Sequence, residues 1–354
     1  MKHRLPFVVI AVTMAGSVLA CAHVSARARS HVTESMRLAA IRRAQVWTAT
    51  DVPSMNLRTG PQGPGAFAPN ETVTCNYLDK KITGRSPKFT CVRPPDDELK
   101  VKFGRNNGEV YAEVAASRLL WALGFVADRM YPVRVVCRGC PPEIKGTEIA
   151  SIQRKTPGKE IEISGISGWA WPELDLVNPA VGGAPREQRD ALKLLAGFIQ
   201  HSDSKAEQQR LICLGGRPDD DAVEPCAETI MMAHDLGLTF GRANLWNRNP
   251  IASTNLAEWS RAHVWSGPTG CVADITRSQT GTLDHPMIAE GGRKFLADLL
   301  VQLTDTQLYD LFDVARFPRH LTATDDSPDT TSVEQWVEVF KKKRNDVVNR
   351  VCPG

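Results

Sequence analysis

Residues 198–210 of the chain read Phe-Ile-Gln-His-Ser-Asp-Ser-Lys-Ala-Glu-Gln-Gln-Arg, and residues 229–241 read Thr-Ile-Met-Met-Ala-His-Asp-Leu-Gly-Leu-Thr-Phe-Gly. Each stretch begins as an apolar run and ends in a group of charged and polar side chains. This pattern predicts two buried segments that deliver Asp203 and Asp235 to the ends of their elements. Two carboxylates presented in this way suit phosphoryl transfer, in which one orients the attacking hydroxyl and the other holds a magnesium ion on the phosphates.

Both stretches resemble motifs of the protein-kinase-like superfamily. The run from His201 to Gln208, His-Ser-Asp-Ser-Lys-Ala-Glu-Gln, resembles the kinase catalytic loop H-R-D-L-K-x-x-N. Asp235-Leu236-Gly237 resembles the metal-binding D-F-G of the same superfamily. The two motifs occur together in the order and spacing that such an enzyme requires.

The resemblance implies a role for each polar residue of the two motifs. Asp203 would be the catalytic base, and Lys205 would neutralise charge on the moving phosphoryl group. Asp235 would bind Mg²⁺ or Mn²⁺ together with Gln208, which stands where the superfamily usually carries Asn. The nucleotide that these parts imply is ATP.

The strongest helix pattern in the chain covers residues 109–125, where apolar side chains recur among alanines and Gly124 supplies the stop. From Glu113 to Phe125 the pattern is similar to a helix of the secretory-pathway kinases that phosphorylate casein. Those proteins show Glu, two small residues, Leu and then Leu-Gly-Phe at matching spacing. In that family the Glu pairs with the nucleotide-binding lysine, so the resemblance implies that Glu113 orients Lys102, with Lys100 as the alternative lysine.

Strand patterns dominate before a predicted hinge at residues 155–159, and helix patterns dominate after it. Residues 98–103 alternate charged and apolar side chains, which also suits an exposed edge strand with solubilising lysines. The connection between the first two strands has a single glycine, Gly84, so the G-x-G-x-x-G pattern of a kinase phosphate loop is absent. Strands are predicted at 72–77, 88–93, 98–103, 131–136 and 148–154, and helices at 186–201, 292–303, 305–315 and from 333 onward.

These patterns predict an α+β, two-lobed, protein-kinase-like fold. The N-terminal lobe would be an antiparallel sheet with the 109–125 helix packed on it, and the C-terminal lobe would be mostly helical. The predicted divisions are a signal peptide at 1–22, a tether and irregular segment at 23–70, an N-lobe at 71–156 and a C-lobe at 157–354.

The first residues have the pattern of an export signal. Lys2 and Arg4 precede an apolar run over residues 7–19, and small residues follow. Val-Leu-Ala-Cys, ending at Cys21, resembles a bacterial lipobox, although ordinary cleavage near Ala20 or Ala22 fits almost as well. The expected location is therefore the periplasm, a membrane through a lipid anchor, or the medium.

The cysteine content also favours export. Nine cysteines are present, and an even set of eight remains without Cys21. An even set in an exported chain indicates disulfides, while a zinc site at Cys137 and Cys140 is the alternative, weakened because no second close pair accompanies them. The predicted pairs are Cys75–Cys91, Cys137–Cys140, Cys213–Cys226 and Cys271–Cys352, the last by elimination.

The charge balance argues against nucleic acid as a partner. Lys plus Arg is 43 and Asp plus Glu is 40, which leaves a net charge of only +3 over 354 residues. The basic run at 341–344 is interpreted as a solvated helix face. The expected partners are a nucleotide and an unknown protein or small-molecule substrate, with a membrane contacted only through an N-terminal lipid anchor.

Two other functions remain open at this point. The first is a catalytically inactive kinase-like binding module, since ATP is scarce outside a bacterial cytoplasm. The second is a metal-dependent phosphohydrolase in which His201, Asp203, His234 and Asp235 act as ligands of the His-Asp type. The sequence does not identify the substrate, nor does it distinguish phosphoryl from adenylyl transfer.

Overall fold

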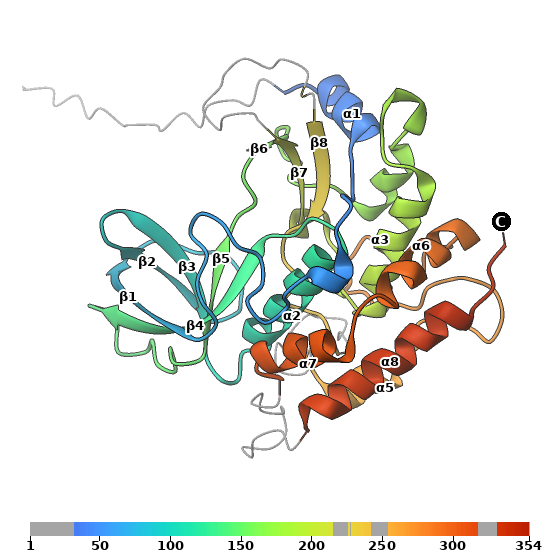
Figure 1. Ribbon diagram of the computed structural model, residues 1–354. Coiled ribbons are helices and arrows are strands. Elements are labelled where there is room, and N and C mark those ends of the chain that lie inside the picture. The colour runs from blue at the N-terminus through green and yellow to red at the C-terminus, as the bar shows by residue number, and fades with distance from the viewer. Residues whose placement is uncertain (1–31, 215–225, 227, 242–253, 318–330, 354) are drawn as a thin grey trace, which may run out of the picture.

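The structure is a computed structural model of the chain and describes residues 32–214, 226, 228–241, 254–317 and 331–353. The predicted signal peptide and Cys21 lie outside these residues. In the part of the chain that is described, no helix is both long and apolar enough to cross a membrane. The fold is mixed α+β, with a β-barrel on the left of Figure 1 and the C-terminal helices on the right.

The barrel consists of five strands in the order β1-β2-β3-β5-β4. The prediction of a purely antiparallel sheet is wrong at one place, because β1 pairs with β4 in parallel and closes the ring. An odd number of strands cannot alternate in direction all the way round a closed ring, so one pair has to be parallel. The strands are β1 (Glu71–Leu78), β2 (Lys88–Arg93), β3 (Asp97–Phe103), β4 (Arg129–Arg138) and β5 (Ala150–Arg154).

The barrel interior explains the alternation of residues 97–103. Leu99, Val101 and Phe103 are buried in a core of their own with side chains from the other four strands. The edge-strand interpretation of these residues is wrong, because β3 pairs with β2 on one side and with β5 on the other. The opposite face of β3 therefore carries Lys102 toward the rest of the molecule, where this lysine is only 2% exposed.

Helix α2 (Glu109–Ala122) lies between the barrel and the C-terminal helices (Figure 1). It packs on β4 and also on α7 (Asp305–Val314), so it is buried on nearly all sides. Arg118 near its end is fully buried and donates hydrogen bonds to the carbonyl oxygens of Leu57, Met130 and Thr59. This arginine binds the preceding segment of the chain to the helix and to β4.

The rest of the chain forms a helical part around a small antiparallel sheet. In the sheet, β7 pairs with β6 and with β8. The N-terminal helix α1 contacts β8, and a large apolar core joins these elements to α2. The elements are α1 (Glu34–Arg43), β6 (Lys159–Glu160), α3 (Arg186–Phe198), β7 (Gln209–Leu214), β8 (Glu228–Ala233), α5 (Leu256–Arg261), α6 (Glu290–Leu300), α7 and α8 (Val333–Asn349).

The interpretation of residues 341–344 as a solvated face is wrong for Lys343. Its side chain is 3% exposed, donates to the carbonyl oxygen of Ala262 and places its ammonium 5.6 Å from the ring centre of Trp259. Burial lowers the pKa of Lys343 to about 8. Four consecutive residues span more than one helical turn of 3.6 residues, so a packed helix has to turn one of them inward.

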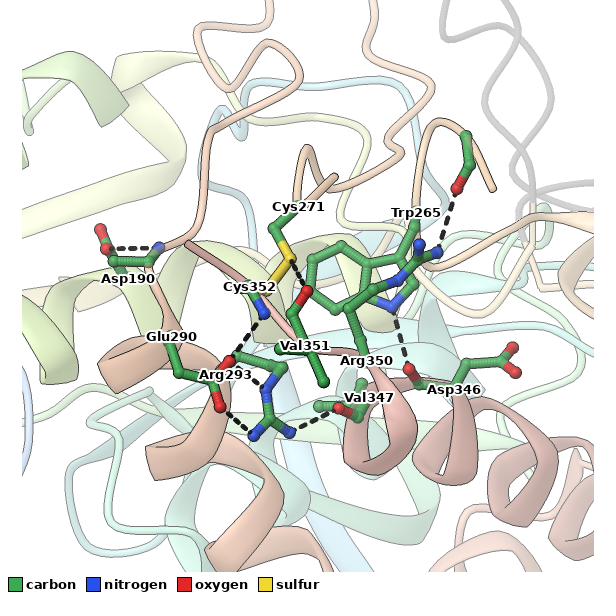
Figure 2. Close-up of a disulfide and its surroundings, with 12 residues drawn as sticks. Asp190, Trp265, Cys271, Glu290, Arg293, Asp346, Val347, Arg350, Val351 and Cys352 are labelled. Atoms are coloured by element: carbon green, nitrogen blue, oxygen red, sulfur yellow. Dashed lines mark hydrogen bonds and ion pairs between the residues drawn. A yellow bond between two sulfur atoms is a disulfide. The ribbon is translucent and has the colours of Figure 1, made fainter. Parts of the chain in front are cut away.

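The four disulfides form as predicted, at Cys75–Cys91, Cys137–Cys140, Cys213–Cys226 and Cys271–Cys352. They are compatible with an exported protein. Figure 2 shows Cys271–Cys352, which joins the C-terminal residues to the segment between α5 and α6. Beside it the main-chain amide of Cys352 donates to Glu290, and Arg293 donates to the carbonyl oxygens of Val347 and Val348.

Removal of the Cys271–Cys352 bond by a double Cys→Ser change is expected to lower the free energy of unfolding by about 2–4 kcal/mol. The bond joins residues 81 apart, so its loss frees a long loop in the unfolded chain. Urea denaturation of the oxidised protein measures the change. The matched control is the same double change at Cys137 and Cys140, whose separation of 3 predicts a smaller loss, and equal losses would contradict this argument.

Candidate active-site cleft

A cleft of about 800 Å³ lies between the barrel and the helical part. Its walls come from five places that are distant in the sequence. The barrel contributes the connection before β2 and the start of β2 itself, and α2 contributes Glu109. The helical part contributes Leu238 and the other lining residues, which are Asp203, Lys205, Ala206, Glu207, Gln208, Asp235, Ser278, Gln279, Thr280 and Thr282.

Lys102 and Glu113, which were predicted to pair, do so beside Glu109 and Asp235, two residues that line this cleft. The Lys102 ammonium lies 2.5 Å from Glu113 Oε1, 2.7 Å from Glu109 Oε2 and 3.6 Å from Asp235 Oδ1. Glu109 was not predicted, although its spacing of four residues from Glu113 places both on one face of α2. Lys100, the alternative lysine, forms no ion pair with any described residue.

The charges of this cluster support one another. Burial opposes the charge of Lys102, but Asp235, Glu113 and Glu109 outweigh it and raise the pKa of Lys102 well above its usual value. Burial, together with the nearby Asp235 and Glu109, raises the pKa of Glu113. Burial also disfavours the Asp235 carboxylate, but Lys102 prevails and lowers the pKa of Asp235. At neutral pH the cluster therefore presents an ammonium at Lys102 and an ionised carboxylate at Asp235.

The glycine of Asp235-Leu236-Gly237 is required by close packing against α2. A Cβ atom at position 237 would lie 2.6 Å from Glu109 Cγ, which is closer than such atoms approach. The Gly237 amide also donates to Asp235 Oδ1 at 3.1 Å. The glycine thus lets Glu109 reach Lys102 while its amide orients the Asp235 carboxylate.

Asp203 lies on the loop that follows α3 and lines the same cleft as Asp235. Its Oδ2 accepts a hydrogen bond of 2.7 Å from Gln208 Nε2 and lies 3.7 Å from the Lys205 ammonium. The main-chain oxygen of Gln208 in turn accepts from the amides of His234 and Asp235. These backbone bonds join the two motifs directly. Four of the six predicted site residues line the cleft, and the other two, Lys102 and Glu113, pair with each other beside Asp235.

The donor atoms fit a hard divalent cation. Carboxylate and amide oxygens are the ligands that Mg²⁺ and Mn²⁺ prefer. Among the described residues, ligand atoms of Glu109, Glu113 and Asp235 lie within 4.8 Å of one another. Lys102 already contacts all three. The two predicted metal ligands, Asp235, whose side chain is 24% exposed, and Gln208, both line the cleft, so their oxygens suit a cation bound there.

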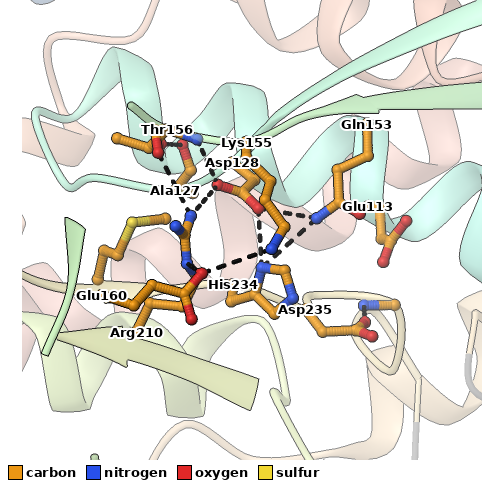
Figure 3. A network of polar contacts seen from close by, with 12 residues as sticks. Glu113, Ala127, Asp128, Gln153, Lys155, Thr156, Glu160, Arg210, His234 and Asp235 are labelled. Atoms are coloured by element: carbon orange, nitrogen blue, oxygen red, sulfur yellow. Dashed lines mark hydrogen bonds and ion pairs between the residues drawn. The ribbon is translucent and has the colours of Figure 1, made fainter. Parts of the chain in front are cut away.

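Behind Asp235 lies a buried polar network centred on Asp128, which sequence analysis did not find (Figure 3). Asp128 is 2% exposed and accepts hydrogen bonds from His234 Nδ1 at 2.7 Å, Gln153 Nε2 at 2.8 Å and the Thr156 amide at 2.7 Å. Arg210 Nη1 also donates to it, at 3.2 Å. An isolated Asp between Ala127 and Arg129 follows no motif, so no sequence signal indicated it.

The Asp128 network links the barrel to the helical part. Gln153 belongs to β5 and Thr156 to the predicted hinge, whereas Arg210 belongs to β7 and His234 directly follows β8. Burial alone would raise the pKa of Asp128, but the hydrogen bond from His234 and the charge of Arg210 outweigh it, so the pKa is lowered. The residue before Asp235 is in this way fixed against the barrel.

The histidines do not form the ligand set of a His-Asp phosphohydrolase. His201 is 1% exposed, contacts Gln209 and does not line the cleft. Burial lowers the pKa of His201 to about 4. His234 directs its Nδ1 to Asp128. Within the described part of the chain, the one group arranged for a metal contains carboxylates only.

Comparison with known proteins does not establish a family or a function for the chain. No protein-family model matches the chain, and no curated protein matches its sequence. Among solved structures, the Helicobacter pylori proinflammatory kinase CtkA is similar, with a TM-score of 0.41 and 11% identity over 80% of this chain and 95% of that chain. A likeness this low carries no weight for function, so the case for an activity rests on the geometry of the cleft.

Proposed function

We propose that the protein is a kinase-like phosphotransferase that moves a phosphoryl group from ATP, with Mg²⁺ or Mn²⁺, to an unknown protein or small molecule. The observation that carries the proposal is the meeting of four side chains. Lys102 contacts both Glu113 and Asp235, and Asp203 lines the same cleft. These residues come from a strand, a helix, a strand end and a loop, so no local pattern forces them together.

Each residue has a chemical task in this proposal. The Asp203 carboxylate, held by Gln208 and Lys205, accepts the proton of the attacking hydroxyl. Lys102, oriented by Glu113, contacts the phosphates of the nucleotide, and Lys205 neutralises charge on the group in transfer. Asp235 and Gln208 hold the divalent cation, whose positive charge stabilises the phosphates.

The proposal includes export of the protein from the cytoplasm. The four disulfides and the pattern of residues 1–22 support it, with Cys21 as the site of a lipid anchor. The pattern of the Glu113 helix is nearest to the secretory-pathway kinases. A catalytically inactive binding module would have the same cleft and would bind nucleotide without turnover.

ATP with Mg²⁺ or Mn²⁺ is expected to stabilise the purified protein against thermal unfolding. A nucleotide at about 100 times its dissociation constant stabilises a protein by roughly 2.7 kcal/mol. Asp235→Asn should remove the metal-dependent part of this gain, because an amide holds a divalent cation less well than a carboxylate. Thermal scans with and without each metal measure both effects.

The control for this experiment is Asp298→Asn, the same change at an exposed position of α6. This variant should respond to ATP and metal as the wild type does. If the wild type gains no stability from any nucleotide with either metal, the proposed function is wrong.

A further inference from the structure

Two residues that line the cleft carry buried hydroxyl groups for which the described part of the chain offers no partner. Ser86 is 7% exposed and Ser278 is 2% exposed, and both residues line the cleft. Among the described residues, neither Oγ atom has a hydrogen-bond partner. A buried hydroxyl left unsatisfied costs about 1–3 kcal/mol. Two such groups from opposite walls of one cleft indicate a polar ligand between them.

A third group, the ammonium of Lys88, belongs to a residue that lines the same cleft. Lys88 lines the cleft and is the partner of Lys102 across the β2–β3 pair. The two lysines differ in their surroundings, because Lys102 contacts three carboxylates whereas Lys88 forms no ion pair with a described residue. A partly buried cation that lies near a second cation and contacts no carboxylate directly, although Glu109 and Asp235 are near enough to act on its charge, favours an anionic ligand.

The Lys88 ammonium lies against the turn before β2. Gly84 has φ +97°, and a Cβ there would collide with Lys88 Nζ. The lysine side chain therefore folds back against the backbone of the turn, which also contains Ser86.

We propose that Lys88, Ser86 and Ser278 form a side-chain subsite for the phosphate chain of the nucleotide. The inference rests on the proposed function and refines it. The connection before β2 lacks the G-x-G-x-x-G pattern that would bind phosphates through backbone amides. In this subsite an ammonium and two hydroxyls bind the phosphates instead, and all three are groups that donate hydrogen bonds to phosphate oxygens.

Lys88→Gln tests the charge in the subsite. With Mg²⁺ present, calorimetry should show ATP binding about tenfold to a hundredfold weaker, since hydrogen bonds to charged groups have that effect. Binding of adenosine, which has no phosphate, should be unchanged. Lys88→Arg should restore most of the ATP affinity, and Lys80→Gln, an exposed lysine in the same connection, should have no effect.

Ser86→Ala and Ser278→Ala test the two hydroxyls. A ligand-binding role predicts opposite effects on stability and on ATP affinity, whereas a structural role does not. Removal of an unsatisfied buried hydroxyl should raise the thermal midpoint of the ligand-free protein, while ATP affinity falls. Unchanged ATP binding in all three variants, or equal losses for ATP and adenosine in Lys88→Gln, would overturn the inference.

Pyrophosphate separates this inference from the proposed function. If the wild type binds Mg²⁺-pyrophosphate and Lys88→Gln does not, the subsite stands even where no nucleotide binds. If the wild type binds ATP but Lys88→Gln binds it equally well, the proposed function stands and the subsite falls. If the wild type binds neither ligand, both are wrong.

Discussion

Asp203→Asn is expected to slow phosphoryl transfer by about 10²–10⁴-fold, the usual contribution of a positioned general base. Asparagine keeps the size of the side chain and an oxygen for the bond from Gln208, but it does not accept the substrate proton. ATP binding should be nearly unchanged, because the proposal assigns the phosphates to Lys102 and the cation to Asp235 and Gln208, not to Asp203. Radiolabelled ATP measures self-phosphorylation and hydrolysis of ATP in single-turnover conditions.

The outcome also separates the two kinase-like functions. Wild-type protein and Asp298→Asn should turn over ATP at the same rate, far above Asp203→Asn. If the wild type binds ATP and metal but its turnover equals that of Asp203→Asn, the protein is the inactive binding module. If Asp203→Asn loses ATP binding as well, Asp203 does not have the role of a base.

Asp128→Ala is expected to lower the free energy of unfolding by about 3–5 kcal/mol, because it breaks a buried ion pair by removing one partner. Arg210 would lose its buried acceptor and keep only the more exposed Glu160 as an ion-pair partner, and His234 would lose its bond to Asp128, so the link between barrel and helical part would weaken. Urea denaturation at neutral pH measures the loss. The matched control is Asp97→Ala, whose partner Arg154 lies nearer the surface, where about 1 kcal/mol or less is expected.

The stabilisation that Asp128 provides is expected to decrease as the pH is lowered. The pKa of Asp128 is lowered in the folded protein, so its stabilisation is complete above the unfolded value of about 3.9 and disappears as pH falls through the folded value. The difference between wild type and Asp128→Ala should therefore shrink below about pH 4. A difference that stays constant down to pH 2 would show that packing, rather than charge, explains the loss.

Much of the fold could be predicted because it depends on local pattern. The alternation of residues 98–103 and the apolar pattern of the 109–125 helix identify elements from neighbouring residues alone. The parallel closure of the barrel depends on how many strands meet in the ring, which no single segment encodes. Lys343 was placed wrongly for a similar reason, since the packing partner Trp259 lies far away in the sequence.

The residues of the candidate site also separate into those that a local sequence pattern predicts and those that it does not. Asp203, Lys205, Gln208 and Asp235 could be predicted because each motif is contiguous in the sequence. Glu109 and Lys88 carry no motif, and they reach the cleft only because α2 and β2 are placed beside β3. Asp128 was harder still to predict from the sequence, because its partners belong to β5, the hinge, β7 and the residue after β8.

The closed barrel also affects how the molecule meets copies of itself. In an open sheet the outer strands expose unpaired amides and carbonyls, on which another chain can add a strand. Each of the five barrel strands, all within the described residues, has a paired neighbour on both sides. In the smaller sheet, Gln45 and Ala127 form bridges to Ile230 and Ala233 of the outer strand β8. Growth into intermolecular sheets, a common hazard for β-rich chains at high concentration, therefore has no starting point on the barrel.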